Sequence, residues 1–390
     1  MKIFNRLLTL LILSTIVGCN DSDSPQHDAP INIPLDPSKY YIHFDADIDT
    51  RGALVDGTLL LANFSAVGYQ FSGTWSAEKA MASPNVFATP SEPQLVTYDG
   101  SVFNYTPIQP WTGNQYSFFG YYPASHNNIK FFDNGAAKSG EPYITYTLVS
   151  RTSSVGHIDV MTAANTDTGV ASSSTVGLEF HHRLAAIDVG ARNYYMHTLD
   201  DGTEVPVTIE ITELDIVLNN LVNESAKIYL DHRTPSEYTA TNESNRRASY
   251  PMVSAQPADH VRSVAPIEPN TEDDRAMRFI TLDNGDNASA MLVIPQKEDL
   301  EVGGKLEYKK KYTDSDGTQR YIPNPNGGDT FKKDDLYMVF NKKLQEGRRY
   351  FIEFTFTSDA ISINVVAADE WTDLDVDDDG IEDDIDYDFE

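Results

Sequence analysis

The chain has 390 residues, of which 40% are hydrophobic and 11% aromatic, enough apolar material for more than one packed core. Aspartate and glutamate outnumber lysine and arginine by 59 to 29, which gives a formal net charge of −30. A surface this acidic repels the phosphates of nucleic acids and of anionic lipids, which argues against both as partners.

The first 18 residues have the pattern of an export signal. Lys2 and Arg6 form a cationic start, residues 7–17 are almost wholly apolar, and Gly18 is the small residue before Cys19. The apolar run is shorter than the about 20 residues that a membrane-spanning helix needs. A cysteine at this junction resembles a lipobox, whose thiol is lipidated (palmitate) and becomes the mature N-terminus. We therefore predict lipid attachment to the membrane at Cys19; the alternative is an ordinary signal peptide.

Residues 19–37 form a polar, acidic tether that cannot bury enough surface to fold alone. Acidic residues directly behind the cysteine resemble the tag with which some Gram-negative bacteria send lipoproteins to the outer face. We therefore expect a lipid-anchored, surface-exposed protein of the outer membrane. Since Cys19 is the chain's one cysteine, no intramolecular disulfide forms.

Beyond the tether the chain shows short runs of alternating apolar and polar residues, separated by turn-forming residues. This pattern predicts an all-β protein built from sandwich domains. The clearest predicted strands are residues 41–48, 116–122, 142–149, 176–189, 205–217, 290–295, 349–357 and 361–365.

A stretch of small and polar residues, 165–175, is predicted to be a linker. It divides the chain into an N-terminal domain at 38–173 and a C-terminal domain at 174–372. Two long polar stretches, 233–269 and 307–333, are expected to be loops that either face a partner or vary freely at the surface.

Several segments carry a resemblance to a known family. They are the lipobox and acidic tether, FDADIDTR (44–51), Trp111, YSFFGYYP (116–123), DVM (159–161), VGLEFHHRLAAI (176–187), LVIPQ (292–296), residues 349–357 and EWTD (370–373). Together they resemble the fimbrillin family, the lipoprotein subunits of type V pili in some Gram-negative anaerobes. The resemblance implies two tandem transthyretin-like β-sandwich domains, a structural or adhesive role in a fimbrium, and other pilus subunits as partners.

The family assembles by strand exchange, and in its shaft subunits a protease cuts after an arginine beyond the first strand. Arg51 holds that position here. The resemblance therefore implies proteolytic processing at Arg51, release from the lipid and transfer to the fimbrium. The alternative is an ordinary surface arginine, in which case the protein keeps its lipid as an anchor, tip or stand-alone adhesin.

The predicted donor strand is the C-terminus, where Ile385, Tyr387 and Phe389 alternate with Asp386 and Asp388. An extended tail would show three apolar side chains on one face. The alternative is a solvated, acidic tail.

Residues 373–390 form an acidic tail that also resembles the calcium loop of thrombospondin type-3 repeats. Alternate carboxylates can converge on a hard cation, and Gly380 permits the turn between them. The predicted Ca²⁺ ligands are Asp375, Asp377, Asp379, Asp383 and Asp386 through their side chains and Ile381 through its carbonyl. The alternative is a merely acidic tail.

Catalytic motifs are missing from the sequence, which argues against an enzyme. There is no Gly-x-Ser-x-Gly, His-Glu-x-x-His or phosphate-binding glycine loop. His181 and His182 are adjacent, so in a strand they point to opposite faces and do not share a metal. The rival function is a monomeric lipid-anchored lipoprotein that binds a glycan or a host ligand, with Trp75, Trp111 and the many tyrosines available to stack on sugar rings. Such aromatics more often fill sandwich cores.

Overall fold

The computed structural model describes most of the chain between residues 41 and 367. The described residues are 41–48, 63–80, 82–87, 89, 92–112, 115–132, 139–153, 156–169, 175–242, 246–253, 261–267, 278–279, 290–340, 343–358 and 360–367. Strands predominate within them, and the one α-helix among them, α1 (Trp75–Glu78), has four residues. The predicted all-β class is confirmed.

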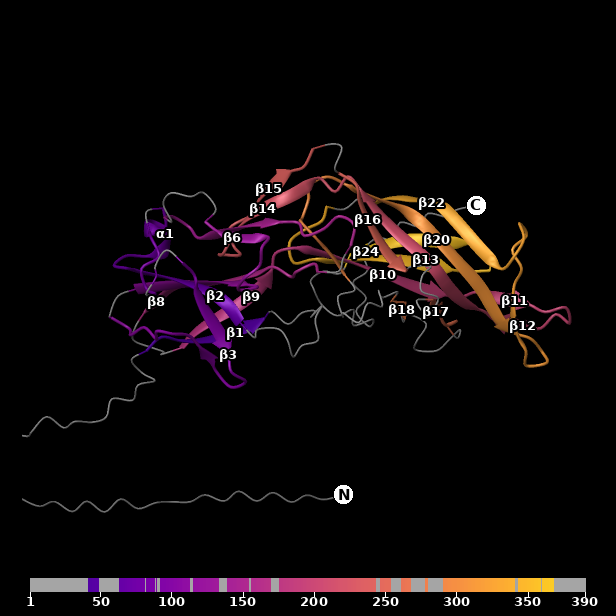
Figure 1. The fold of residues 1–390 in the computed structure, drawn as a ribbon, viewed down its shortest axis with the longest axis horizontal. Coiled ribbons are helices and arrows are strands. Elements are labelled where there is room, and N and C mark those ends of the chain that lie inside the picture. The colour runs from indigo at the N-terminus through magenta and orange to yellow at the C-terminus, as the bar shows by residue number, and fades with distance from the viewer. Residues whose placement is uncertain are drawn as a thin grey trace, which may run out of the picture. The chain divides into compact units, whose positions relative to one another are not determined.

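Seven strands close into a barrel, drawn in indigo to magenta at the left of Figure 1. In spatial order they are β1 (His43–Ile48), β4 (Phe103–Asn104), β3 (Gln94–Tyr98), β2 (Asn63–Phe71), β5 (Gln115–Tyr122), β8 (Met161–Gly169) and β9 (Thr175–His182). Aromatic side chains fill the interior: Phe64, Phe118 and Phe180 are fully buried there. The alternation of apolar and polar residues along β9 places every second side chain in this core.

Two further sheets pack face to face. One contains β18 (Arg278–Phe279), β10 (Ala185–Asn193), β23 (Arg349–Phe356) and β24 (Ile361–Ala367), with β19 (Met291–Val293) also paired to β10. The other contains β16 (Ala248–Val253), β13 (Thr208–Asn219), β20 (Leu300–Thr313) and β21 (Gln319–Tyr321), with β17 (Arg262–Val264) on β13 and β22 (Thr330–Phe340) on β20. Beside them lies the hairpin of β11 (Met196–Thr198) and β12 (Glu204–Pro206).

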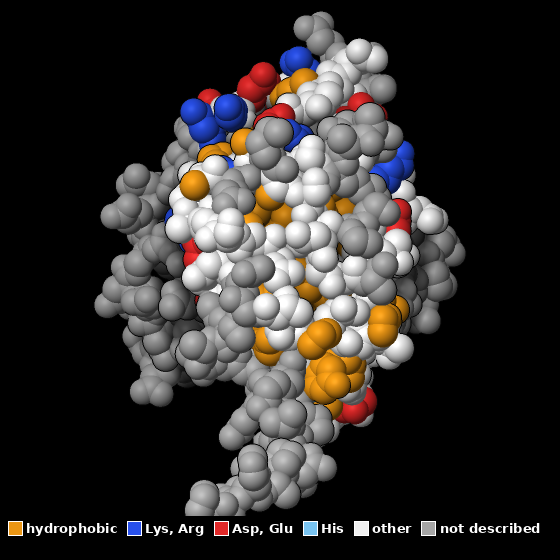
Figure 2. All heavy atoms as spheres, turned by 90° about the vertical axis from the view of Figure 1, so that its left-hand side faces the viewer, with side chains coloured by type: hydrophobic (Ala, Val, Ile, Leu, Met, Phe, Trp, Pro, Cys, Tyr) orange, Lys and Arg blue, Asp and Glu red, His pale blue; other side chains and the backbone are white. Residues whose placement is uncertain are grey.

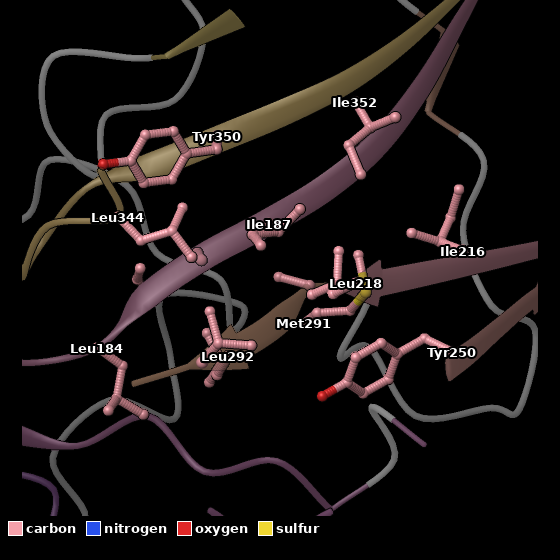
Figure 3. Packing of buried hydrophobic residues seen from close by; sticks show 14 of the residues in the cluster. Leu184, Ile187, Ile216, Leu218, Tyr250, Met291, Leu292, Leu344, Tyr350 and Ile352 are labelled. Atoms are coloured by element: carbon pink, nitrogen blue, oxygen red, sulfur yellow. The ribbon is translucent and has the colours of Figure 1, made fainter. Parts of the chain in front are cut away.

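The two sheets share one apolar core. Ile187 and Ile352 come from the first sheet, and Ile216 and Leu218 come from the second (Figure 3). All four side chains are at most 1% exposed. Alternation in β13 thus buries one face of the strand, as the sequence predicts, whereas β23 is buried on both faces.

A fourth sheet combines segments that are far apart in the sequence. It contains β6 (Ile129–Phe131) and β7 (Tyr143–Thr147) together with β14 (Asn223–Tyr229) and β15 (Glu237–Ala240). β7 and β14 pair along five residues, from Tyr143↔Tyr229 to Thr147↔Ser225. The sheet therefore joins chain segments from both sides of residue 174, and β9 pairs with the barrel strands β1 and β8. The domain division at 173/174 stays a prediction.

Three predicted irregular segments contain strands instead. Residues 161–169 form β8, paired with β5 around a register shift between Tyr116 and Phe118, so the 165–175 linker prediction is wrong for its first five residues. Residues 307–333 belong largely to β20, β21 and β22, and residues 233–269 include β15, β16 and β17. Charged and amide side chains are frequent in these segments, so an alternation of apolar and polar residues is not visible in them. The strands are instead held by backbone pairing and by ion pairs between strands.

Candidate functional site

The first strand in the described part of the chain, β1, completes the barrel. β1 runs parallel to β9 from His43↔Thr175 to Ile48↔Phe180, and antiparallel to β4 at Phe44↔Phe103. It is thus a central strand with a neighbour on each side, and its removal would leave the sheet open between β4 and β9.

The side chains of β1 alternate between the core and solvent. Ile42, just before the strand, is fully buried and Phe44 is 4% exposed, while Asp45 and Asp47 are exposed. This arrangement confirms the two-faced pattern predicted for residues 41–48. Burying two such apolar side chains stabilises the folded state by about 3–6 kcal/mol.

Phe44 lies inside a ring of aromatic side chains. Its centroid is 5.9 Å from that of Phe64, 5.6 Å from that of Tyr105 and 5.7 Å from that of Phe118. The contacts with Phe64 and Phe118 are edge to face, the arrangement that ring quadrupoles favour. Without Phe44, these rings would line an apolar cavity.

Polar contacts hold the start of β1. The amide of Ile42 donates to the carbonyl of Gln109 at 2.9 Å, and the Tyr105 hydroxyl donates to the carbonyl of Ile42 at 3.0 Å. Burial raises the pKa of Tyr105 to about 12. The hydrogen bond from the Gln109 amide to the Tyr105 oxygen lowers this pKa, but by less than burial raises it. The phenol therefore stays protonated at neutral pH and remains a donor. Tyr41 and Pro110 form a further bridge.

The predicted site residues fall outside the described part of the chain. They are Cys19, Arg51, the donor residues Ile385, Tyr387 and Phe389, and the proposed calcium ligands Asp375, Asp377, Asp379, Ile381, Asp383 and Asp386. The structure reaches Ile48, three positions before Arg51, and resumes at Asn63. Among the described residues, no helix is long and apolar enough to cross a membrane.

The two adjacent histidines have different partners, as expected of neighbours in a strand. The ring of His181 lies 3.7 Å from that of His232, whereas His182 Nδ1 lies 2.8 Å from a carboxylate oxygen of Asp159. Burial, followed by the nearby charge of His181, lowers the pKa of His232 to about 4. In the described ranges, no three histidine, cysteine, aspartate or glutamate side chains are placed to hold a metal ion.

The tryptophans of the rival glycan-binding function are packed against other aromatic side chains. Trp75 is 4% exposed, with its ring 4.8 Å from Phe119 and 4.9 Å from Tyr69. Trp111 is half-buried and meets Tyr116 edge to face at 4.9 Å. The expectation that such aromatics fill the core is confirmed for Trp75.

The residues that surround β1 could not be identified from the sequence. Phe64 lies on β2, Tyr105 directly follows β4 and Phe118 lies on β5, and only the pairing of the strands brings them together. The available signal was the density of aromatic residues within 63–71 and 115–122, which indicates buried strands but not what they pack against.

Comparisons with known proteins agree with this architecture. The Fimbrillin-like family model matches residues 68–371. A fimbrial protein from Bacteroides vulgatus ATCC 8482 superimposes with a TM-score of 0.56 at 18% identity, covering 85% of this chain and all of that one (100%). Candidate cell adhesion proteins from Bacteroides uniformis ATCC 8492 and Bacteroides ovatus ATCC 8483 are each 13% identical, with TM-scores of 0.41 and 0.42. They cover 85% and 86% of this chain, and 99% of their own chains in both cases.

No curated protein matches the sequence. The family model nevertheless spans most of the chain, from within the barrel strand β2 to four residues beyond β24. The first of these solved structures shares the fold over its whole length. The chain belongs to the fimbrillin-like family.

Proposed function

We propose that this protein is a structural and adhesive subunit of a cell-surface fimbria, a type V pilus, and that it assembles by donor-strand exchange. Family membership supports the fimbrial role. The observation that carries the assembly mechanism is the place of β1: it is the first described strand, it contributes Phe44 to the barrel core, and it ends three positions before Arg51.

Cleavage after Arg51 would leave β1 held by non-covalent contacts alone. Its loss would expose the backbone edges of β4 and β9 and the aromatic rings around Phe44. An open edge of this kind accepts a strand from another chain. The incoming strand contributes main-chain hydrogen bonds and alternate side chains, which is the recognition mode of donor-strand complementation.

The proposed donor is the C-terminus of a neighbouring subunit. Its Ile385, Tyr387 and Phe389 have the same i, i+2, i+4 spacing as Ile42, Phe44 and Ala46. A donor strand with this spacing would place one aromatic ring at the position vacated by Phe44. The acidic residues between them would face solvent, as Asp45 and Asp47 do in β1.

In this proposal Cys19 carries the lipid that delivers the subunit to the outer membrane, and a processing protease then releases it. A subunit that is left uncut keeps its lipid and serves as an anchor, a tip or a stand-alone adhesin. The other partners are the neighbouring pilus subunits.

The test is digestion of the purified protein with an arginine-specific protease. We expect a new N-terminus at Gly52, followed by a ladder of oligomers that resists SDS. The matched control, Arg51→Ala, should stay intact at this bond and form no ladder. A wild-type protein that is cut at Arg51 but stays monomeric, and that is retarded on glycan affinity gels, would instead support the glycan-binding lipoprotein.

A further inference from the structure

Exposed apolar side chains gather on one part of the barrel. Seven large hydrophobic residues are exposed in the described ranges, and five of them are close to β3, β4 or the start of β1. They are Tyr41 (39% exposed), Leu95 (50%), Tyr98 (45%), Val102 (55%) and Ile108 (47%). Leu95 and Tyr98 lie on β3, Val102 directly precedes β4, Ile108 lies beyond β4, and Tyr41 precedes β1 and bridges to Pro110. Figure 2 shows hydrophobic side chains clustered low on the face of the barrel. We refer to these five residues as the apolar patch.

The patch is nearly free of charge in a strongly acidic protein. Of the 20 residues from 93 to 112, Asp99 alone is charged, whereas charged residues make up 23% of the chain. Two copies that each carry a formal charge of −30 repel one another over most of their surfaces. An uncharged apolar area is where such copies approach at least electrostatic cost.

The tip of the hairpin between β3 and β4 is ordered by the one charge that it contains. The Asp99 carboxylate accepts hydrogen bonds from the amides of Ser101 and Val102, both at 2.9 Å, and from the side chain of Asn104 at 2.8 Å. These hydrogen bonds lower the pKa of Asp99, so the group stays ionised and bonded within the turn. Val102 is therefore presented in a fixed position, which reduces the entropy lost on binding.

The patch is continuous with the β1 groove. Tyr41 bridges to Pro110, Ile108 is adjacent to the Gln109 carbonyl that receives the Ile42 amide, and the ring of Tyr98 lies 4.9 Å from that of Phe103, the β4 partner of Phe44. A donor strand that runs in the direction of β1, with Ile385 at the position of Ile42, brings the rest of its subunit towards Tyr41 and Ile108.

From these observations we infer that the apolar patch is the surface on which a second copy of this chain docks when its donor strand fills the β1 groove. This inference rests on the proposed function and adds a subunit contact outside the groove. Burial of the patch against the neighbouring copy removes apolar side chains from water, which stabilises the assembly. The main-chain hydrogen bonds of strand exchange are the same for many sequences, so the patch adds a contact that they do not provide.

The experiment compares Val102→Lys and Ile108→Lys with a matched control, Tyr337→Lys. Tyr337 is 49% exposed but lies on β22, outside the barrel. Each full-length variant is cut at Arg51, and two quantities are measured: the rate at which SDS-resistant oligomers form, and the affinity of the processed subunit for a fluorescent peptide of residues 375–390. The two test positions lie in separate segments, and thermal unfolding must match the wild type for a variant to be scored.

We expect both patch variants to form oligomers about tenfold more slowly or worse, the effect of losing about 1.4 kcal/mol of contact energy. Peptide affinity should stay within about twofold of the wild type, because the groove is unchanged, and Tyr337→Lys should behave as the wild type in both assays.

Wild-type oligomerisation rates in both patch variants would overturn the inference and leave the proposed function intact. Absence of both oligomers and peptide binding in the wild type would overturn the proposed function, and the inference with it. A third outcome would also overturn the inference: the wild type is retarded on a glycan affinity gel, Val102→Lys is not, and the two form oligomers at the same rate. The patch would then bind a glycan and not a second copy.

Discussion

The ring of Phe44 meets the ring of Phe118 edge to face, with centroids 5.7 Å apart and planes at 86°. Phe118 belongs to β5, deep in the barrel, whereas Phe44 belongs to a strand that precedes a candidate cleavage site. The contact makes the N-terminal strand part of the core, and it also makes that strand the element whose loss changes the barrel most.

Phe44→Ala should destabilise the protein by about 3–5 kcal/mol, the usual cost of removing a buried phenylalanine ring. After cleavage at Arg51, the shortened side chain should also speed the release of β1. Urea unfolding and limited proteolysis measure the two effects. Asp45→Ala, on the exposed face of the same strand, is the control and should change stability by less than about 0.5 kcal/mol. Equal stability of the two variants would show that β1 is not part of the core.

Tyr105→Phe removes two hydrogen bonds and no apolar contact. The Ile42 carbonyl loses its 3.0 Å donor and the Gln109 amide loses its 3.2 Å acceptor, so we expect a loss of about 1–3 kcal/mol. The wild type should also lose stability as the pH rises from about 10 to about 12, because Tyr105 has a pKa near 10 when unfolded and about 12 when folded. The variant should lose less over this range in urea unfolding at several pH values. An identical alkaline loss in both proteins would contradict the assignment.

A second pH effect is expected at the acid side of neutrality from His157. Its Nδ1 accepts the amide of Leu292 at 2.9 Å, so the proton lies on Nε2, which donates to the Ser150 carbonyl at 3.1 Å. Burial lowers the pKa of His157 below its ordinary value near 6.5, and this outweighs the opposite effect of the Ser150 hydrogen bond. Since the folded-state pKa is lowered, the stabilising contribution is present above about pH 6.5 and is lost as the pH falls.

His157→Asn keeps an oxygen that can accept the Leu292 amide but removes the titration. Between pH 7.5 and pH 5, the free energy of unfolding should therefore fall less steeply in the variant, with a difference of up to about 1.4 kcal/mol per pH unit. Parallel curves for the two proteins would rule out the role of His157.

Two glycines of the barrel offer a matched pair. A Cβ at Gly120 would lie 2.8 Å from Cζ of Phe180 and 3.3 Å from Cδ1 of Leu178, both on β9, whereas a Cβ at Gly177 would meet nothing within 4 Å. Gly120→Ala should thus cost about 1–3 kcal/mol through overpacking, and Gly177→Ala much less. Thermal unfolding measures both, and a Gly177→Ala variant that is the less stable of the two would contradict the packing described here.

The acidic tail carries a separate prediction. Isothermal titration with millimolar Ca²⁺ should give heat with the wild type, in the about 10⁻⁴–10⁻³ M range of extracellular calcium modules. Asp377→Ala and Asp379→Ala should abolish the heat, and Glu390→Ala, outside the proposed loop, should retain it. No heat from the wild type, or an equal response in the aspartate variants, would end the calcium proposal.

Strands with one apolar face could be predicted from the sequence, because the period of two is visible wherever one side is buried. β9 and β13 are examples. The paired strands β20 and β22 could not, because they form cross-strand ion pairs: Lys311 of β20 with Glu210 of β13, and Lys332 of β22 with Glu307 of β20. Such pairs become visible only once the register between strands is known.

The candidate site, too, could be predicted only in part from the sequence. The two-faced pattern of β1 was readable, and so was the position of Arg51. The partner of β1 was not, because β9 begins at Thr175, and local sequence carries no information on pairing over such a distance. For the same reason the aromatic ring around Phe44 and the apolar patch became apparent only in three dimensions.

The most direct test is the N-terminus of the subunit within fimbriae sheared from the cell surface, read by mass spectrometry. If β1 is discarded and its groove is filled by the tail of a neighbour, the polymerised subunit begins at Gly52. A polymer whose subunits all begin at lipidated Cys19 and retain residues 43–48 would contradict the account.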